Sequence, residues 1–174
     1  TPTLLDAYPI VCADPPWRYD SVSTPDLRAI ENQYPTMALD DIKALEVPAQ
    51  DDAVLFLWAT NPKLTEALEL MEAWDFSYRT NLVWVKDRIG MGYYARSQHE
   101  MLLVGRRGNL RVPDPEDRPA SVITAPRTEH STKPVEAYAV IERMYPDLPR
   151  VEMFARSPRQ GWAVWGNQAD GIAA

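Results

Sequence analysis

A run of seven apolar residues, AVLFLWA at positions 53–59, sets the firmest limit on the fold of this 174-residue chain. No polar residue interrupts it, which is typical of a strand buried on both faces of a parallel sheet. Shorter apolar runs recur along the chain, and we expect each of them to form a further strand. These runs lie at 9–13, 81–85, 101–105, 121–124, 151–155 and 162–165.

Helical patterns separate these predicted strands. LTEALELMEAW at 64–74 has apolar residues at helical spacing and follows Asn61-Pro62, which we interpret as the N-cap and first helical position. A second helix is predicted from Lys133-Pro134 to Met144, and a weaker one over 39–45. The alternation predicts an α/β fold, with a mostly parallel sheet and flanking helices, in one domain over 1–174. Three long loops, 17–38, 86–98 and 106–120, are candidates for function.

The composition excludes several classes of protein. One Cys and two His cannot supply a disulfide framework or an ordinary zinc site, so we predict no metal. No apolar run approaches the roughly 20 residues of a membrane span. No basic residue precedes Arg18, so we expect no signal peptide and a cytoplasmic protein.

The charge is uneven along the chain. The net charge is −7, yet residues 79–133 hold 10 basic and 6 acidic residues. Arg88 and Arg96 in this segment flank Tyr93 and Tyr94, and arginine beside aromatic rings is typical of nucleic-acid contacts. The alternative is a set of solvated loops. Because the whole chain is acidic, we expect nucleic-acid binding that is weak and salt-sensitive, or that a homodimer or a heteromeric partner assists.

The segment Asp14-Pro15-Pro16-Trp17 ends the first predicted strand. Ligands of open α/β sheets bind at the carboxyl ends of strands. Two prolines hold the backbone rigid and remove two N–H donors, which leaves a carboxylate, an unpaired Pro15 carbonyl and an indole. Such a site suits a flat substrate that presents an amino group, such as a nucleobase. The alternative is a proline-rich turn with a packed tryptophan.

Asp-Pro-Pro-Trp resembles motif IV of the amino methyltransferases, which modify adenine N6 or cytosine N4 with S-adenosylmethionine. Four further stretches narrow the resemblance to the MT-A70 family, the METTL-type N6-adenine methyltransferases and their bacterial and phage relatives. They are QYPTM (33–37), FLWATNP (56–62), the stretch 130–134, and IERMYP through EMFARS to GNQADG (141–171). The resemblance covers about 8 to 171 and implies a Rossmann-like class I methyltransferase fold in permuted order, with motif IV first and the cofactor strand last.

The resemblance also implies roles for individual residues. Asp14, with the Pro15 carbonyl, would accept hydrogen bonds from the N6 amine, and Asp14 would lie near the methionine moiety of the cofactor; the catalytic motif also includes Pro16 and Trp17. Lys133 would bind the methionine carboxylate at a helix N-terminus. The residues expected around the ribose and adenosine are Phe154, Arg156, Asn167 and Gln168; those expected on the substrate side are Trp17, Tyr34, Glu100, Arg88 and Arg96.

Structural alternatives stay open for several of these residues. Lys133 is alternatively an exposed lysine beside a helix cap, Phe154 a plain core residue, and Tyr34 a residue packed under its loop. Asn167 and Gln168 are alternatively part of a C-terminal loop. A buried thiol is the preferred interpretation of Cys12.

Four functional hypotheses follow. The first is N6-adenine methylation of DNA, favoured over the second, the same reaction on RNA, by the bacterial and phage resemblance. The third is a catalytically silent, nucleic-acid-binding subunit of a methyltransferase complex, against which the intact Asp-Pro-Pro-Trp and Lys133 speak. The fourth is N4-cytosine methylation, for which Ser-Pro-Pro is the more usual motif. In each active case the target base is unpaired or flipped out of a duplex.

Overall fold

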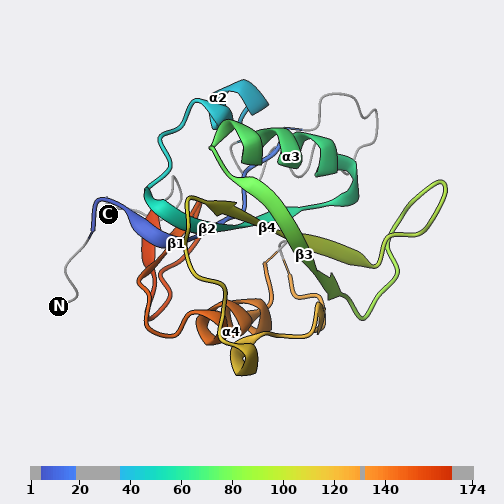
Figure 1. The fold of residues 1–174 in the computed structure, drawn as a ribbon. Helices are drawn as coiled ribbons and strands as arrows, with labels where there is room; N and C mark the ends of the chain where they lie inside the picture. Colours follow the sequence, from blue (N-terminus) through green and yellow to red (C-terminus); the bar gives the residue numbers. More distant parts are fainter. Residues whose placement is uncertain (1–4, 19–35, 130–131, 166–174) are drawn as a thin grey trace.

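The structure is a computed structural model, and it describes residues 5–18, 36–129 and 132–165. The described residues form one seven-stranded sheet with helices on both faces (Figure 1). The strands are β1 (Tyr8–Ala13), β2 (Ala49–Ala59), β3 (Ser77–Val85), β4 (His99–Arg107), β5 (Val122–Thr124), β6 (Arg150–Met153) and β7 (Ala163–Trp165). The helices are α2 (Leu39–Lys43), α3 (Leu64–Ala73) and α4 (Val135–Met144), and the 3-10 turns are η1 (Asn61–Lys63) and η2 (Pro115–Asp117).

The strand order is β5-β3-β4-β2-β1-β6-β7. Only β4 runs antiparallel to its neighbours β2 and β3; the other four pairings are parallel. The prediction of a mostly parallel α/β sheet is therefore confirmed. The first strand of the chain lies inside the sheet, between β2 and β6, so the carboxyl ends of β1, β2 and β6 meet at one edge.

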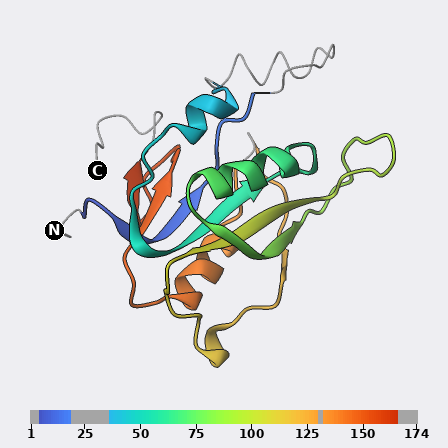
Figure 2. The ribbon, with the colours of Figure 1, turned by 45° about the horizontal axis from the view of Figure 1, so that its top comes forward.

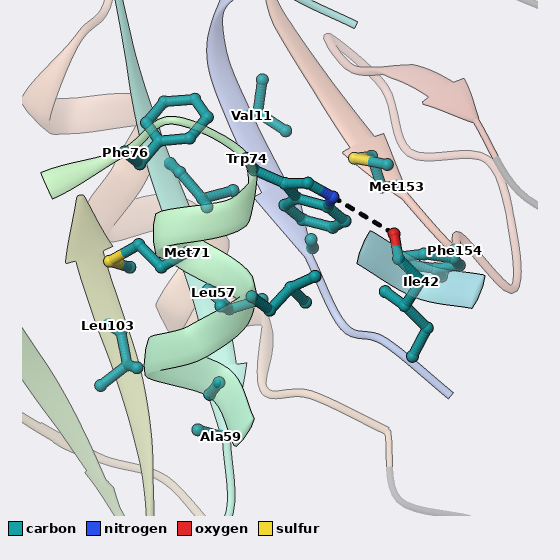
Figure 3. Packing of buried hydrophobic residues seen from close by; sticks show 14 of the residues in the cluster. Val11, Ile42, Leu57, Ala59, Met71, Trp74, Phe76, Leu103, Met153 and Phe154 are labelled. Carbon is teal, nitrogen blue, oxygen red and sulfur yellow. Dashed lines mark hydrogen bonds between the residues drawn. The ribbon is translucent and has the colours of Figure 1, made fainter. Parts of the chain in front are cut away.

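Two hydrophobic clusters cover the two faces of the sheet. On one face, β1, β2 and β6 pack against α2 and α3, and Figure 3 shows Val11, Leu57 and Met153 facing this layer. The indole N–H of Trp74 donates a 3.2 Å hydrogen bond to the Ile42 carbonyl, which joins the end of α3 to α2. The second cluster buries the alternate strand residues beneath α4, on the opposite side of the sheet (Figures 1 and 2).

Each predicted strand exists, but the ends of the elements differ from the expectation. Strand β3 begins at Ser77 rather than at residue 81, because its polar, exposed first half pairs with β4 and shows no apolar run. The predicted strand 151–155 ends at Met153, since Phe154 has a φ of 62° and leaves the extended conformation.

The helix predicted at 64–74 begins at Leu64, but the prediction of Asn61 as its N-cap and Pro62 as its first helical position was wrong. Asn61 and Pro62 form a 3-10 turn with Thr60 as its N-cap, and α3 begins only at Leu64. Lys133 and Pro134 likewise precede α4, with Pro134 as its N-cap. The predicted helix at 39–45 is a short α2 that ends at Lys43.

Candidate active site

Asp14 follows β1 directly, at the edge of the sheet where the parallel strands end. The chain continues from β1 to β2 on one side, whereas β6 pairs with β1 on the other side. Ligands of open α/β sheets bind outside the carboxyl ends of strands at such a change of direction. The sheet therefore places Asp14 where this architecture binds its ligands.

The Asp-Pro-Pro-Trp segment forms a tight turn after β1. The Trp17 N–H donates a 2.9 Å hydrogen bond to the Pro15 carbonyl, so the expectation of an unpaired Pro15 carbonyl was wrong. One lone pair of this oxygen is still available, because a carbonyl oxygen has two. The Pro16 carbonyl accepts from the Met37 N–H at 2.9 Å, within a parallel bridge between Trp17 and Met37. Trp17 itself is buried in the cluster that α2 and α3 cover.

A buried lysine joins two carboxylates at this edge. Lys133 Nζ lies 2.7 Å from Glu100 Oε1 and 3.7 Å from Asp14 Oδ1, and its side chain is only 8% exposed. Glu100 comes from the start of the reversed strand β4, Asp14 from the end of β1 and Lys133 from the approach to α4. The structure therefore brings together three of the predicted residues from distant parts of the sequence. The alternative of Lys133 as an exposed lysine is wrong.

Lys86 is the second lysine of this cluster, and it was not among the residues predicted from the sequence. Lys86 Nζ lies 2.7 Å from Glu100 Oε2, so Glu100 bridges two ammonium groups. Lys86 lies 4.9 Å from the centroid of the Trp84 ring, and Lys133 lies 5.1 Å from the centroid of the Trp58 ring. Lys86 comes directly after the apolar run 81–85. This position could have indicated its role, because the run ends at the same edge of the sheet as β1.

The two tryptophans form the floor of the cluster. Their rings are in edge contact, with centroids 6.1 Å apart and an interplanar angle of 76°. The Trp84 N–H donates to the Ala125 carbonyl at 2.9 Å. The Trp58 N–H is buried and has no hydrogen-bond partner among the residues that the structure describes. An unsatisfied buried donor is costly, so its place beside Lys133 is consistent with a site that receives a ligand with acceptor atoms.

Burial and charge act in opposite directions on the ionisable groups of the cluster. Burial raises the pKa of Asp14 above its ordinary value, and the positive charge of Lys133 opposes part of that rise. Burial also acts to raise the pKa of Glu100, but the charges and hydrogen bonds of Lys133 and Lys86 outweigh it and lower the pKa. For Lys133, burial favours the neutral amine, but Asp14 and Glu100 outweigh it and raise the pKa. Lys133 is thus held as a buried cation, and Glu100 as a carboxylate.

The end of β6 lies beside this cluster. Phe154 is buried, its ring is in edge contact with Trp165 at 5.4 Å, and its N–H donates to the Trp165 carbonyl at 2.6 Å. A φ of 62° is uncommon for a residue with a side chain, and such backbone strain gathers at functional sites. The charge of the next charged residue, Arg156, opposes part of the rise that burial causes in the pKa of Asp14. The Phe154 ring is therefore part of the hydrophobic core, whereas its left-handed backbone turns the chain toward the site.

A second polar group lies beneath α4, behind the Asp14 cluster. The Tyr138 hydroxyl donates a 2.7 Å hydrogen bond to Glu152 Oε1, and burial raises the pKa of Glu152. Cys12 pairs with Glu152 across β1 and β6, and burial raises the pKa of its thiol, in agreement with the expected buried thiol. Arg159 lies over the Tyr138 ring at 3.6 Å. A cavity of about 510 Å³ beside this group is lined by Val135, Tyr138, Ala139, Glu142 and residues 157–160.

The remaining predicted site residues lie elsewhere. Arg88 and Arg96 belong to the segment 86–98, which connects β3 to β4 and projects from the sheet (Figures 1 and 2). Arg88 contacts the neighbouring Asp87 at 3.8 Å, and Arg96 Nε donates to the Gly90 carbonyl at 3.2 Å. Tyr34, Asn167 and Gln168 lie outside the described residues, so their predicted roles stay predictions.

In residues 5–18, 36–129 and 132–165, no three or more His, Cys, Asp or Glu side chains gather as they would around a metal ion. No helix in those ranges has the length and apolarity needed to cross a membrane.

Comparisons with known proteins show which family the chain resembles. The MT-A70 family model matches residues 8–168. The chain is 33% identical to a Type II methyltransferase, M.MunI, from a Mycoplasma species, over 91% of this chain and 76% of that protein. It is 35% identical to an N(6)-adenosine-methyltransferase MT-A70-like protein of Arabidopsis thaliana, over 97% of this chain and 25% of the relative. It is 32% identical to the human N(6)-adenosine-methyltransferase catalytic subunit METTL3, over 98% of this chain and 30% of that subunit.

The two eukaryotic relatives are thus much longer than the chain, which spans 25% and 30% of their lengths, whereas it spans most of M.MunI. The family match covers nearly all of the sheet, from β1 to β7, and includes Asp14, Glu100 and Lys133. The chain therefore belongs to the MT-A70 family of methyltransferases.

Proposed function

We propose that this protein transfers a methyl group from S-adenosylmethionine to the N6 amine of adenine in DNA. The observation that carries the proposal is the cluster of the partly exposed Asp14 with the buried Lys133 and Glu100 at the carboxyl edge of the sheet. The named relatives support the chemistry, since two of them are N(6)-adenosine-methyltransferases. DNA is favoured over RNA because the chain spans most of a bacterial Type II methyltransferase.

The residues of the cluster fit the amino-acid end of the cofactor. That end carries one carboxylate and one ammonium group, and the site offers the buried cation of Lys133 and the partly exposed carboxylate of Asp14, 3.7 Å apart. Lys133 would hold the carboxylate, helped by the N-terminus of α4, which follows it. Asp14 would face the ammonium group and the positively charged sulfur of the cofactor. Arg156, with Asn167 and Gln168, would bind the ribose and adenosine through side chains that suit hydroxyl groups.

The bound cofactor would supply a methyl group on a positively charged sulfur. Adenine N6 is a poor nucleophile, because its lone pair is delocalised into the ring. Asp14 and the second lone pair of the Pro15 carbonyl would accept the two N6–H groups and direct the nitrogen lone pair toward the methyl carbon. Asp14 need not be a strong base, because the amine becomes acidic only as it gains the methyl group. Catalysis would come from alignment and from electrostatics in a partly buried site.

Glu100 would act on the substrate side of the same cluster. Lys86 and Lys133 hold both of its oxygens, which fixes the orientation of its carboxylate. A group held in this way can orient a neighbouring ligand without paying the entropy of ordering itself. Trp17 and Tyr34 would border the base. We also propose that residues 1–174 form a single domain and that the protein is cytoplasmic. A homodimer or a heteromeric partner would assist it.

The test is transfer of label from radioactive S-adenosylmethionine to single-stranded DNA, duplex DNA and RNA of one sequence. We expect label in adenine of single-stranded DNA with the wild type and none with Asp14→Ala. The matched control is Asp41→Ala, since Asp41 is an exposed carboxylate on α2. Label that enters RNA in preference to DNA would contradict the choice of polymer. Cofactor binding without transfer to any polymer would favour the catalytically silent subunit.

A further inference from the structure

The segment 86–98 presents two adjacent aromatic rings to solvent. Tyr93 and Tyr94 are 105% and 107% exposed, and Met91 beside them is 88% exposed. Large aromatic side chains normally bury much of their surface, so two neighbouring rings without protein contact require an explanation. Neither the family match nor the proposed chemistry at Asp14 assigns them a role.

Hydrogen bonds brace this segment as a hairpin, which we call the 86–98 hairpin. At its base, the Lys86 N–H donates to the Gln98 carbonyl at 2.8 Å, and the Gln98 side chain donates to the Lys86 carbonyl at 2.9 Å. Nearer the tip, the Gly90 N–H donates to the Ser97 carbonyl at 2.7 Å. These bonds order the backbone of the hairpin, which projects from the sheet (Figures 1 and 2).

A glycine closes the tip of the hairpin. A Cβ atom at Gly92 would lie 1.8 Å from the Ala95 carbonyl oxygen, so only glycine permits this approach of the two strands. A second anchor fixes the base, where the Asp87 carboxylate accepts a 2.9 Å hydrogen bond from the Arg127 N–H. The exposure of the rings thus belongs to a defined local structure.

The base of the hairpin is also part of the candidate active site. Lys86 is its first residue, and Glu100 follows its last residue by two positions; both belong to the charge cluster with Lys133. Tyr93 lies seven positions after Lys86, so the tip lies within about 25 Å of the cluster. A polymer whose target base reaches Asp14 would therefore pass within reach of the tip.

The charge of the hairpin favours a nucleic acid as the occupant. The side chain of Arg88 is 73% exposed, and Arg96 bonds within the hairpin through Nε, one of several donor groups of a guanidinium. The segment 79–133 carries a net positive charge within a chain of net charge −7. Aromatic rings beside arginines are the usual surface for stacking unpaired bases.

We propose that Tyr93 and Tyr94 stack on unpaired bases of the DNA that flank the target adenine, while Arg88 and Arg96 contact its phosphates. This inference rests on the proposed function and adds to it the element that holds the substrate strand. Stacking needs unpaired bases, so the hairpin would favour single-stranded or locally opened DNA over an intact duplex.

The experiment measures the affinity of the full chain for a fluorescent single-stranded DNA that contains one adenine. We expect the double variant Tyr93→Ala/Tyr94→Ala to bind it at least about 5-fold more weakly, the smallest effect usual for loss of a stacking ring. The double variant Tyr93→Phe/Tyr94→Phe keeps both rings and should bind within about 2-fold of the wild type. The control is Met91→Ala, an equally exposed but non-aromatic position on the same hairpin.

Three further readings separate the outcomes. Titration with S-adenosylmethionine should be the same for every variant, which shows that the site is folded. Equal DNA affinity of wild type and the double alanine variant, or tighter binding of the same sequence as RNA, would overturn the inference. A change of oligomeric state in the double alanine variant, measured by sedimentation, would instead assign the rings to a contact between copies of the chain.

Failure of the inference is distinguishable from failure of the proposed function. If the wild type methylates DNA and the alanine variant has the same KM for DNA, only the role of the hairpin is wrong. If the wild type binds DNA through the tyrosines but never transfers a methyl group, the inference holds and the proposed reaction is wrong. A wild type that binds no DNA would overturn both.

Discussion

At the scale of single residues, the site depends on a lysine that is buried and still charged. Lys133 keeps its charge because Glu100 and Asp14 lie within 3.7 Å of its ammonium group and outweigh the effect of burial. Lys86 in turn balances the second oxygen of Glu100. The two lysines and the two carboxylates balance one another, so the amino-acid end of the cofactor, with one carboxylate and one ammonium group, would add no net charge to the cluster.

Lys133→Met should abolish most of the binding of S-adenosylmethionine. The variant removes a charged hydrogen-bond donor of the kind that contributes about 1.5–3 kcal/mol, so we expect binding to weaken by about 10-fold or more. Isothermal titration calorimetry measures this directly, and Lys43→Met is the control because Lys43 pairs with Glu69 on the surface. Unchanged affinity in a folded Lys133→Met protein would remove Lys133 from the cofactor site.

Glu100 should make stability depend on pH. Burial alone would raise its pKa, but Lys133 and Lys86 lower it below the ordinary value of about 4.3. A lowered folded-state pKa stabilises the fold above the unfolded-state pKa, and this contribution is lost as the pH falls through the folded-state pKa. Glu100→Gln imitates the protonated carboxyl, so it should lower the free energy of unfolding by about 1.5–3 kcal/mol near pH 7 and by progressively less in acid.

Urea unfolding of wild type and Glu100→Gln at a series of pH values measures this difference. Glu69→Gln is the surface control, expected to change the free energy of unfolding by less than about 1 kcal/mol at every pH. A Glu100→Gln difference that stayed constant from neutral pH to acid would mean that the lysines do not hold Glu100 ionised.

At the scale of elements, the strands follow from their apolar runs, but their exact ends do not. The run 53–59 predicts β2 because burial on both faces leaves an uninterrupted apolar sequence. No such pattern marks the exposed start of β3, because that half of the strand is fixed by its pairing with β4. No pattern marks the left-handed conformation of Phe154 either, because the turn after β6 fixes it. The 86–98 hairpin was expected only as a long loop, because its bracing bonds are mostly between backbone groups.

Gly92→Ala should therefore disturb the hairpin and little else. The added Cβ would overlap the Ala95 carbonyl oxygen, which belongs to the backbone and cannot move without reopening the tip. We expect weaker binding of single-stranded DNA, by about 5-fold or more if one stacked ring is misplaced, with an unchanged thermal unfolding midpoint. Hydrogen exchange and DNA titration check the two parts, and equal DNA affinity would show that the tip geometry has no role in binding.

At the scale of the whole molecule, the distribution of charge limits how the protein holds nucleic acid. A chain of net charge −7 repels phosphate over most of its surface, and the excess of basic residues lies within 79–133. Arg88→Ala/Arg96→Ala should weaken DNA binding and reduce the slope of log affinity against log salt by about 1.4 if each arginine contacts one phosphate of a single strand. Arg143→Ala is the matched control, because its side chain is 70% exposed and lies on α4.

The assembly of the site is also a property of the whole fold. Asp14, Lys86, Glu100 and Lys133 are separated by up to 119 positions in the sequence, and no spacing rule joins them. The resemblance to the family gave Asp14, Glu100 and Lys133, because short motifs surround them. It did not give Lys86 or the tryptophan floor, whose part in the site becomes visible only when β3 and β4 pair in the sheet.

The most direct measurement is the identity of the methylated nucleoside. Single-stranded DNA incubated with the protein and S-adenosylmethionine is digested to nucleosides and separated by mass spectrometry, for wild type and Asp14→Asn. The account predicts N6-methyladenine from the wild type and at least about 100-fold less from Asp14→Asn, since the amide keeps the shape but loses the charged acceptor. N4-methylcytosine, or equal product from both proteins, would contradict the assignment of Asp14 as the group that positions the adenine amine.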